Sequence, residues 1–226
     1  MIAGTQSRGV AHSLDGLASS TTVRSATPVS SGGLEPIGVR ESGSVLSSQN
    51  IAPASVGLAK SIHVGKDPTQ LTYDPGRGEV FIANSGSDSA SVISDRNNTV
   101  ADTLSLGSST GPVAVAYDST MGEVFVLKEA GNVSVINDST DSIVATLKVG
   151  SDPVGIAYDS ENGDVFVTNC GSATVSVISD LTDKVIATMS GAKCPEGIVY
   201  DSSQNRVFVA ESGHDSVVVF NTSKPA

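Results

Sequence analysis

Four aspartates recur at regular spacing, and their carboxylates are the first groups in this chain that could do chemistry. Each follows a tyrosine, and the pairs use every tyrosine of the chain; the aspartates are Asp74, Asp118, Asp159 and Asp201. Four carboxylates in a ring could bind a divalent cation, which prefers oxygen ligands. Each Asp is, however, followed at once by Ser or Pro and then by a nearby Gly or Asn. Because an Asp at the head of such a turn accepts hydrogen bonds from backbone N–H groups, we predict turn residues and not a metal centre.

The remaining candidate catalytic groups are scattered. His12, His63 and His214 share no metal-ligand spacing. The sequence also lacks a glycine-rich phosphate loop, a Gly-x-Ser-x-Gly nucleophile elbow and a Cys-x-x-Cys motif. We therefore predict no metal, no cofactor and no enzymatic activity.

The charge and hydropathy of the chain exclude two classes of partner. Thirteen basic residues stand against 24 acidic ones, which gives a net charge of −11. Such a surface repels nucleic acid and anionic lipid, whose binding depends on Lys and Arg contacts to phosphate. No stretch approaches the roughly 20 apolar residues that a membrane-spanning helix needs. We predict neither nucleic-acid binding nor membrane insertion.

The elements that position these residues follow from an internal repeat. Val-Phe comes six residues after the Asp of each Tyr-Asp pair, and the pairs are 41–44 residues apart. In the clearest copy, 153–158, 164–169, 174–178 and 184–189 are apolar or alternating runs separated by turn residues. Four antiparallel strands per roughly 42 residues are typical of one β-propeller blade. We predict an all-β fold of about four such blades, at 66–107, 108–150, 151–191 and 192–226.

The two ends of the repeat array do not match. Residues 1–57 are rich in Ser, Gly and Thr and predict a low-complexity or degenerate segment. Residues 58–65 resemble the fourth strand of a blade, whereas the last repeat has no such strand after Asn221. Pairing them would remove two exposed sheet edges, so 58–65 is a possible closing strand. Two alternatives are a fragment of a larger ring and a half-ring completed by self-association with a second chain.

The repeats resemble a known family. Val165-Phe166-Val167-Thr168-Asn169, with the following Gly-Ser and Val-Ser-Val-Ile, is similar to the YVTN-type β-propeller repeat of archaeal surface-layer proteins, other exported proteins and bacterial relatives. Residues 80–84 match nearly as well, but two copies replace the Asn by Lys128 and Glu211. The resemblance implies an extracellular or cell-surface location, with the leader absent from this chain, because residues 1–20 do not form a signal peptide. An intracellular location is the alternative.

The two cysteines fall in loops that a propeller would place on one face. Cys170 lies between the second and third strands of one repeat, and Cys194 lies at the entry to the next repeat. Two interpretations stay open, a disulfide between neighbouring blades and two unpaired thiols.

The loops that follow each Val-Phe strand differ most between repeats and form the candidate binding surface. The candidate residues are Asn84, Asp88, Lys128, Glu129, Asn169, Glu211, His214 and Asp215. We expect a structural or adhesive module that binds a protein or glycan partner. The alternative is a propeller enzyme of the lactonase or quinoprotein type, with ligands from the Asn and Glu positions at the central channel, although Lys128 would interrupt such a ring.

Overall fold

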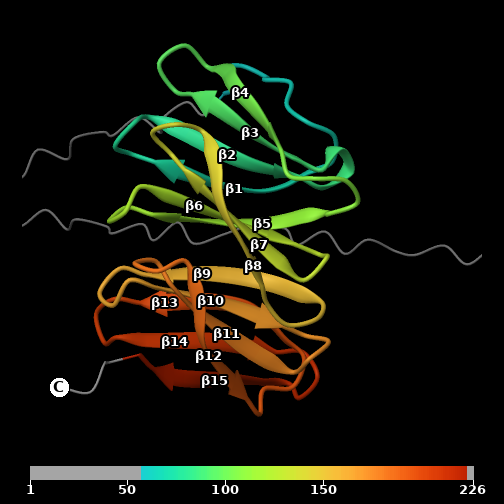
Figure 1. Ribbon diagram of the computed structural model, residues 1–226, viewed down its shortest axis with the longest axis vertical. Coiled ribbons are helices and arrows are strands. Elements are labelled where there is room, and N and C mark those ends of the chain that lie inside the picture. Colours follow the sequence, from blue (N-terminus) through green and yellow to red (C-terminus); the bar gives the residue numbers. More distant parts are fainter. Residues whose placement is uncertain (1–56, 223–226) are drawn as a thin grey trace, which may run out of the picture. The chain divides into compact units, whose positions relative to one another are not determined.

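A computed structural model describes residues 57–222, which form four antiparallel sheets, one for each repeat (Figure 1). The first sheet contains β1 (Pro68–Asp74), β2 (Glu79–Asn84), β3 (Ser89–Ser94) and β4 (Thr99–Ser105), with the short 3-10 turn η1 (Ser85–Ser87) after β2. The second contains β5 (Pro112–Asp118), β6 (Glu123–Lys128), β7 (Asn132–Asn137) and β8 (Ser142–Lys148). The third contains β9 (Pro153–Asp159), β10 (Asp164–Asn169), β11 (Thr174–Ser179) and β12 (Lys184–Ser190). The fourth contains β13 (Pro195–Asp201), β14 (Arg206–Glu211) and β15 (Ser216–Asn221). The predicted all-β blade architecture is confirmed.

The repeated aspartates form the turns that the sequence predicted. Asp159 is buried, and its Oδ1 accepts hydrogen bonds from the backbone N–H groups of Glu161 at 3.0 Å and Asn162 at 3.1 Å. Asp74 and Asp118 make the same pair of bonds to the residues two and three positions ahead. Each carboxylate therefore replaces the ladder bonds that end where the strand turns, which is an Asx-turn function.

The two faces of each blade have separate neighbours, because side chains alternate along a strand. The second strand of each sheet (β2, β6, β10 and β14), which carries the repeated Phe, is called the middle strand below. This Phe and the residue two positions after it lie on the front face, which we define as the face toward the following repeat. Phe81 and Ala83 pack there against Val124 and Val126 on the back face of the second sheet. Phe125 packs in the same manner against the third sheet. The core thus lies between successive blades, and each interface buries the same repeat positions.

The predicted closing strand at 58–65 is not formed. Residues 57–64 have no strand conformation, and the fourth sheet contains only three strands in the described part of the chain. The hydrogen bonds of this segment go to the first sheet: Lys60 Nζ donates to the Asn98 carbonyl at 2.7 Å, and Gly65 N donates to Ser91 Oγ at 3.3 Å. The segment therefore contacts the blade that follows it, and the expectation that it completes the fourth sheet within the chain is corrected. The predicted low-complexity segment lies outside the described residues, except for Gly57.

Candidate functional site on the loop face

The loops after the middle strands and the linkers that enter each blade share one face, here called the loop face. In every repeat the first residue after the middle strand donates its backbone N–H to a carbonyl of the entering linker. The pairs are Ser85 to Asp67, Glu129 to Gly111, Cys170 to Asp152 and Ser212 to Cys194, at 2.9–3.3 Å. This repeated bond holds each loop against the linker and fixes the shape of the face.

A disulfide joins Cys170 to Cys194, as one of the two interpretations of the sequence proposed. It connects the loop after β10 with the linker that enters the fourth blade. The bond therefore fastens two neighbouring blades on the loop face. The two cysteines are 24 residues apart in the sequence. In the chain-entropy model, closing a loop of this length stabilises the fold by roughly 3 kcal/mol.

Four of the eight candidate residues point inward at the last position of a middle strand. Asn84, Lys128, Asn169 and Glu211 are all buried. Asn84 Nδ2 donates to Ser91 Oγ at 3.0 Å, but its buried Oδ1 has no hydrogen-bond partner. Asn169 also reaches the linker: its Nδ2 donates to Ser176 Oγ at 3.1 Å, and its Oδ1 accepts from the Gly150 backbone N–H at 3.1 Å. The side chain thus clamps the entering linker to the third strand of its own blade.

Lys128 and Glu211 perform the same clamping with different chemistry. Lys128 Nζ donates to Ser134 Oγ at 2.9 Å and to the Leu106 carbonyl of the linker at 3.5 Å, and burial lowers the pKa of its ammonium group. Glu211 accepts from Ser216 Oγ at 2.7 Å and from the Lys193 backbone N–H at 2.7 Å. These hydrogen bonds hold the pKa of its carboxyl below the usual value. The two residues that replace Asn therefore also bond both to their own blade and to the linker.

Asp88 also shapes the backbone of the loop face. Its carboxylate accepts three backbone N–H bonds from the linker after β4, from Ser109 and Thr110 at 2.7 Å and from Gly111 at 2.9 Å. These bonds lower the pKa of the Asp88 carboxyl. An aspartate with three backbone donors is an anchor for a linker, and little of its capacity is left for a ligand.

The remaining three candidates, Glu129, His214 and Asp215, are exposed on the loop face. Glu129 borders a hollow of about 230 Å³ with Ala130, Gly131, Lys148, Val149, Gly150 and Ser151. Asp215 borders a second hollow of about 300 Å³ with Glu196, Ala210, Glu211, Ser212, Ser216 and Val217. The exposed part of the candidate surface therefore consists of these residues and hollows.

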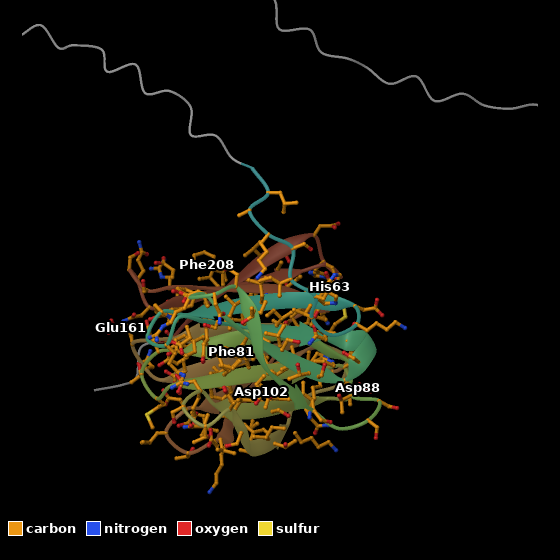
Figure 2. All side chains as sticks on the ribbon, turned by 90° about the horizontal axis from the view of Figure 1, so that it is seen from above. His63, Phe81, Asp88, Asp102, Glu161 and Phe208 are labelled. Carbon is orange, nitrogen blue, oxygen red and sulfur yellow. A yellow bond between two sulfur atoms is a disulfide. The ribbon has the colours of Figure 1, made fainter. Side chains whose placement is uncertain are left out.

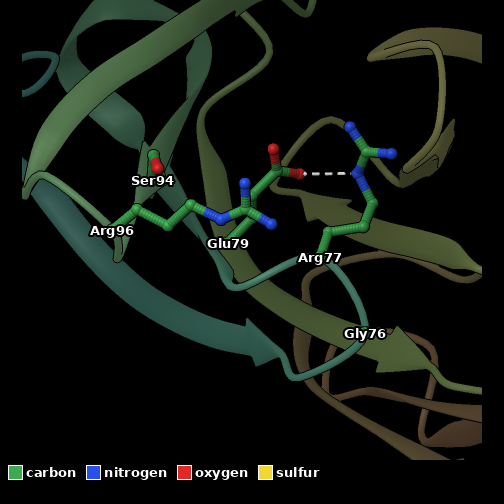
Figure 3. A pocket seen from close by; sticks show the side chains of 5 residues that line it. All are labelled: Gly76, Arg77, Glu79, Ser94 and Arg96. Atoms are coloured by element: carbon green, nitrogen blue, oxygen red, sulfur yellow. Dashed lines mark hydrogen bonds and ion pairs between the residues drawn. The ribbon is translucent and has the colours of Figure 1, made fainter.

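The opposite face carries the Asx turns, and its first-blade hollow is lined by Gly76, Arg77, Glu79, Ser94 and Arg96 (Figure 3). Two arginines there could attract an anion. Arg77 Nε, however, donates to Glu79 Oε2 at 3.0 Å, and Figure 3 shows Glu79 between the two arginine side chains. The nearby carboxyls of Asp138 and Asp141 add further negative charge. The hollow therefore offers no unbalanced positive charge.

An acidic cluster that the sequence analysis missed lies between the second and third blades. Burial raises the pKa of the Glu123 carboxyl to about 7, with further contributions from Asp183, Asp118 and Asp180. Glu123 Oε2 and Asp183 Oδ1 are both buried without a donor. A proton held by Glu123 can be donated to Asp183, so this interface favours a protonated carboxyl. The signal for this cluster in the sequence was the acidic residue that recurs directly after the first turn of the repeat.

In residues 57–222, no group of three or more His, Cys, Asp or Glu side chains is arranged to hold a metal ion. The Asn and Glu positions that the enzyme alternative would use make hydrogen bonds within and between blade elements instead. The same part of the chain has no helix long and apolar enough to cross a membrane.

Comparisons with solved structures identify the fold as that of β-propeller blades. The chain is similar to Kuenenia stuttgartiensis hydrazine synthase, with a TM-score of 0.63, 19% identity and coverage of 73% of this chain and 49% of that one. It is also similar to the RRP9 WD40 repeats, with a TM-score of 0.60, 14% identity and coverage of 70% and 52%. A functionally unknown protein from Desulfotomaculum acetoxidans gives a TM-score of 0.58, 16% identity and coverage of 68% and 51%. The chain thus spans about half the length of these structures.

No protein-family model and no curated protein matches the sequence. The class that the fold and the repeats define is a β-propeller repeat protein. At these identities the similarity concerns the fold, and function must be argued from the residues of the loop face.

Proposed function

We propose that this chain is a non-enzymatic binding module of the YVTN-repeat type, located outside the cell or on its surface, that holds a protein or glycan partner on the loop face. The observation that carries the proposal is that buried and exposed residues of that face have different roles. Buried clamps such as Asn169 and anchors such as Asp88 fix the loops, while the exposed loop residues differ from blade to blade. A rigid scaffold with variable tips is a common arrangement for recognition.

Two further observations support the location and the class of partner, respectively. The bond between Cys170 and Cys194 belongs to a class that persists in oxidising compartments and is rare in the cytosol. The net charge of −11 favours solubility and disfavours phosphate-bearing partners. The sequence resemblance to exported propellers agrees with both.

An array experiment tests the binding function. The labelled full chain is applied to an array of glycans and of cell-envelope proteins from its source organism. We expect saturable binding that is lost when Glu129→Lys and Asp215→Lys are combined, because both side chains are exposed on the loop face. Glu161→Lys is the matched control: it also reverses an exposed acid, and Figure 2 shows Glu161 on the side of the described chain opposite Asp88. Equal loss in both variants would contradict a loop-face site.

A calcium titration by calorimetry separates this proposal from the enzyme alternative. We expect no tight stoichiometric heat, since the amide and carboxylate groups at the clamp positions are occupied by hydrogen bonds. Tight binding of one calcium ion per chain that is abolished by Asn169→Ala would favour a metal-dependent propeller enzyme.

A further inference from the structure

The front face of the fourth sheet is apolar, and no blade covers it in the described part of the chain. In the first blade the front-face residues Phe81, Ala83, Ala90 and Val92 are fully buried by the next blade. Their counterparts in the fourth sheet are Phe208, Ala210, Val217 and Val219, of which Val217 is 61% exposed and Val219 46% exposed. A hollow of about 240 Å³ opens there, lined by Gly197, Ile198, Val199, Phe208, Ala210 and Val217.

The back face of the first sheet is exposed along β1, although Ile82 of β2 is only 5% exposed. Leu71 is 63% exposed, whereas Val115, at the same place in β5, is buried against the preceding blade. Tyr73 is 48% exposed, but Tyr158, its counterpart in β9, bridges to Thr120 of the preceding blade at 2.9 Å. Within residues 57–222, no blade precedes the first sheet, whereas each later sheet packs against a preceding blade.

These two faces are complementary because they are the two halves of an interface that the chain already forms three times. Phe and a small residue on one front face meet two branched apolar residues on the next back face: Phe81 and Ala83 meet Val124 and Val126. A large exposed apolar patch of this kind marks an interaction site. The partner whose chemistry fits the fourth front face is thus a first sheet of the same kind.

The sequence register relates residues 57–63 to the outer strand that is missing from the fourth sheet in the described part of the chain. In the second and third blades Val133 pairs with Leu147 and Val175 pairs with Met189, and each outer partner lies six residues before the proline that opens the next blade. In the first blade the outer partner, Leu104, lies eight residues before Pro112. Ile62 stands six residues before Pro68 in the same relation. Extending the register places Ile62 opposite Val217.

The anchor of this segment is compatible with that pairing. A Cβ on Gly65 would lie 2.5–2.6 Å from Ser87 and Asn84, just as one on Gly150 would crowd Ser172 and Asn169. Gly150 lies against the third blade in this way, although the residues before it belong to β8 of the second blade. Gly65 can therefore remain on the first blade while the residues before it pair elsewhere.

We propose that a second copy of this chain docks head to tail, its first sheet covering the front face of the fourth sheet and its residues 57–63 pairing with β15. The same contact in the opposite direction closes a symmetric pair with twice the number of blades. A closed pair removes both exposed faces and the open edge of β15, which a single copy leaves uncovered. It agrees with the similarity to chains of which this one spans 49–52%.

The solution mass of the full chain is the first test. Light scattering after gel filtration should give twice 22.8 kDa. Val217→Asp should weaken the pair by more than about tenfold, because it places a carboxylate in an apolar contact. Leu181→Asp is the matched control, since Leu181 is 77% exposed on a turn of the third blade and should leave the mass unchanged. Far-ultraviolet circular dichroism checks that both variants are folded.

Cysteine cross-linking tests the register and the identity of the partner strand. The chain has no free thiol, so a mixture of Ile62→Cys and Val217→Cys variants should form a disulfide-linked species of twice the mass on oxidation. A mass of 22.8 kDa at every concentration would overturn the proposal, as would a pair insensitive to Val217→Asp. Cross-linking within single chains of the Ile62→Cys/Val217→Cys double variant would also overturn it, because the strand would then close its own ring.

Discussion

The acidic cluster between the second and third blades gives a sharp prediction about pH. The folded pKa of Glu123 is about 7, above its ordinary value of 4.5, because burial and three neighbouring acids disfavour the charge. The folded state therefore binds this proton more tightly than the unfolded state does. Its stabilising contribution is fully present below the unfolded pKa and is lost as the pH rises from about 4.5 to about 7.

The size of the effect follows from the two pKa values. Each pH unit between them corresponds to about 1.4 kcal/mol, and partial solvation of the site reduces the total, so we expect about 2 kcal/mol. Glu123→Gln keeps the shape of the side chain and removes the charge. At pH 8 the variant should have a higher free energy of unfolding than the wild type, and near pH 5 the two free energies should converge.

Urea unfolding followed by circular dichroism at pH 5 and pH 8 measures this difference. Glu161→Gln, which changes an exposed glutamate, is the control for general charge effects. Identical pH dependence in the wild type and Glu123→Gln would refute the reasoning, because the cluster would then not hold a proton in the folded state.

Three further predictions concern stability and use the same urea assay. Replacing both Cys170 and Cys194 by Ser should lower the free energy of unfolding by roughly 3 kcal/mol, and an unchanged midpoint would contradict the role of the disulfide. Phe125→Ala should cost about 3–5 kcal/mol because Phe125 is fully buried between two blades. Met121→Ala, at an exposed turn, should change stability by less than about 0.5 kcal/mol, so equal effects would argue against inter-blade packing as the core. Asn169→Ala should cost about 1–3 kcal/mol, since it leaves a linker N–H without its acceptor; a neutral variant would contradict the clamp.

The features that the sequence predicted well depend on local chemistry or on the repeat itself. The turn function of Asp159 depends only on the residues that follow it, so the local sequence was sufficient to predict it. The pairing of Cys170 with Cys194 was foreseeable as one of two options, because blade topology places their loops on one face.

Two features could not be read from the sequence: whether the side chains at the ends of the Val-Phe strands are buried, and which sheet edge the segment 58–65 lies beside. Asn84 and Asn169 end strands that are buried on both faces, so the alternation of side chains alone could not show that these last residues are buried. The segment at 58–65 has the sequence pattern of an outer strand, but a strand needs a free sheet edge with which to pair. Pattern alone does not say whether that edge belongs to the same chain.

The most direct test of the proposed function measures binding of the fluorescently labelled full chain to intact cells of its source organism. The account predicts saturable surface binding that falls at least about tenfold when Glu129→Lys and Asp215→Lys are combined and stays unchanged in Glu161→Lys, a difference of about 1.4 kcal/mol or more. Absence of saturable surface binding, or equal loss in the loop-face and opposite-face variants, would contradict it.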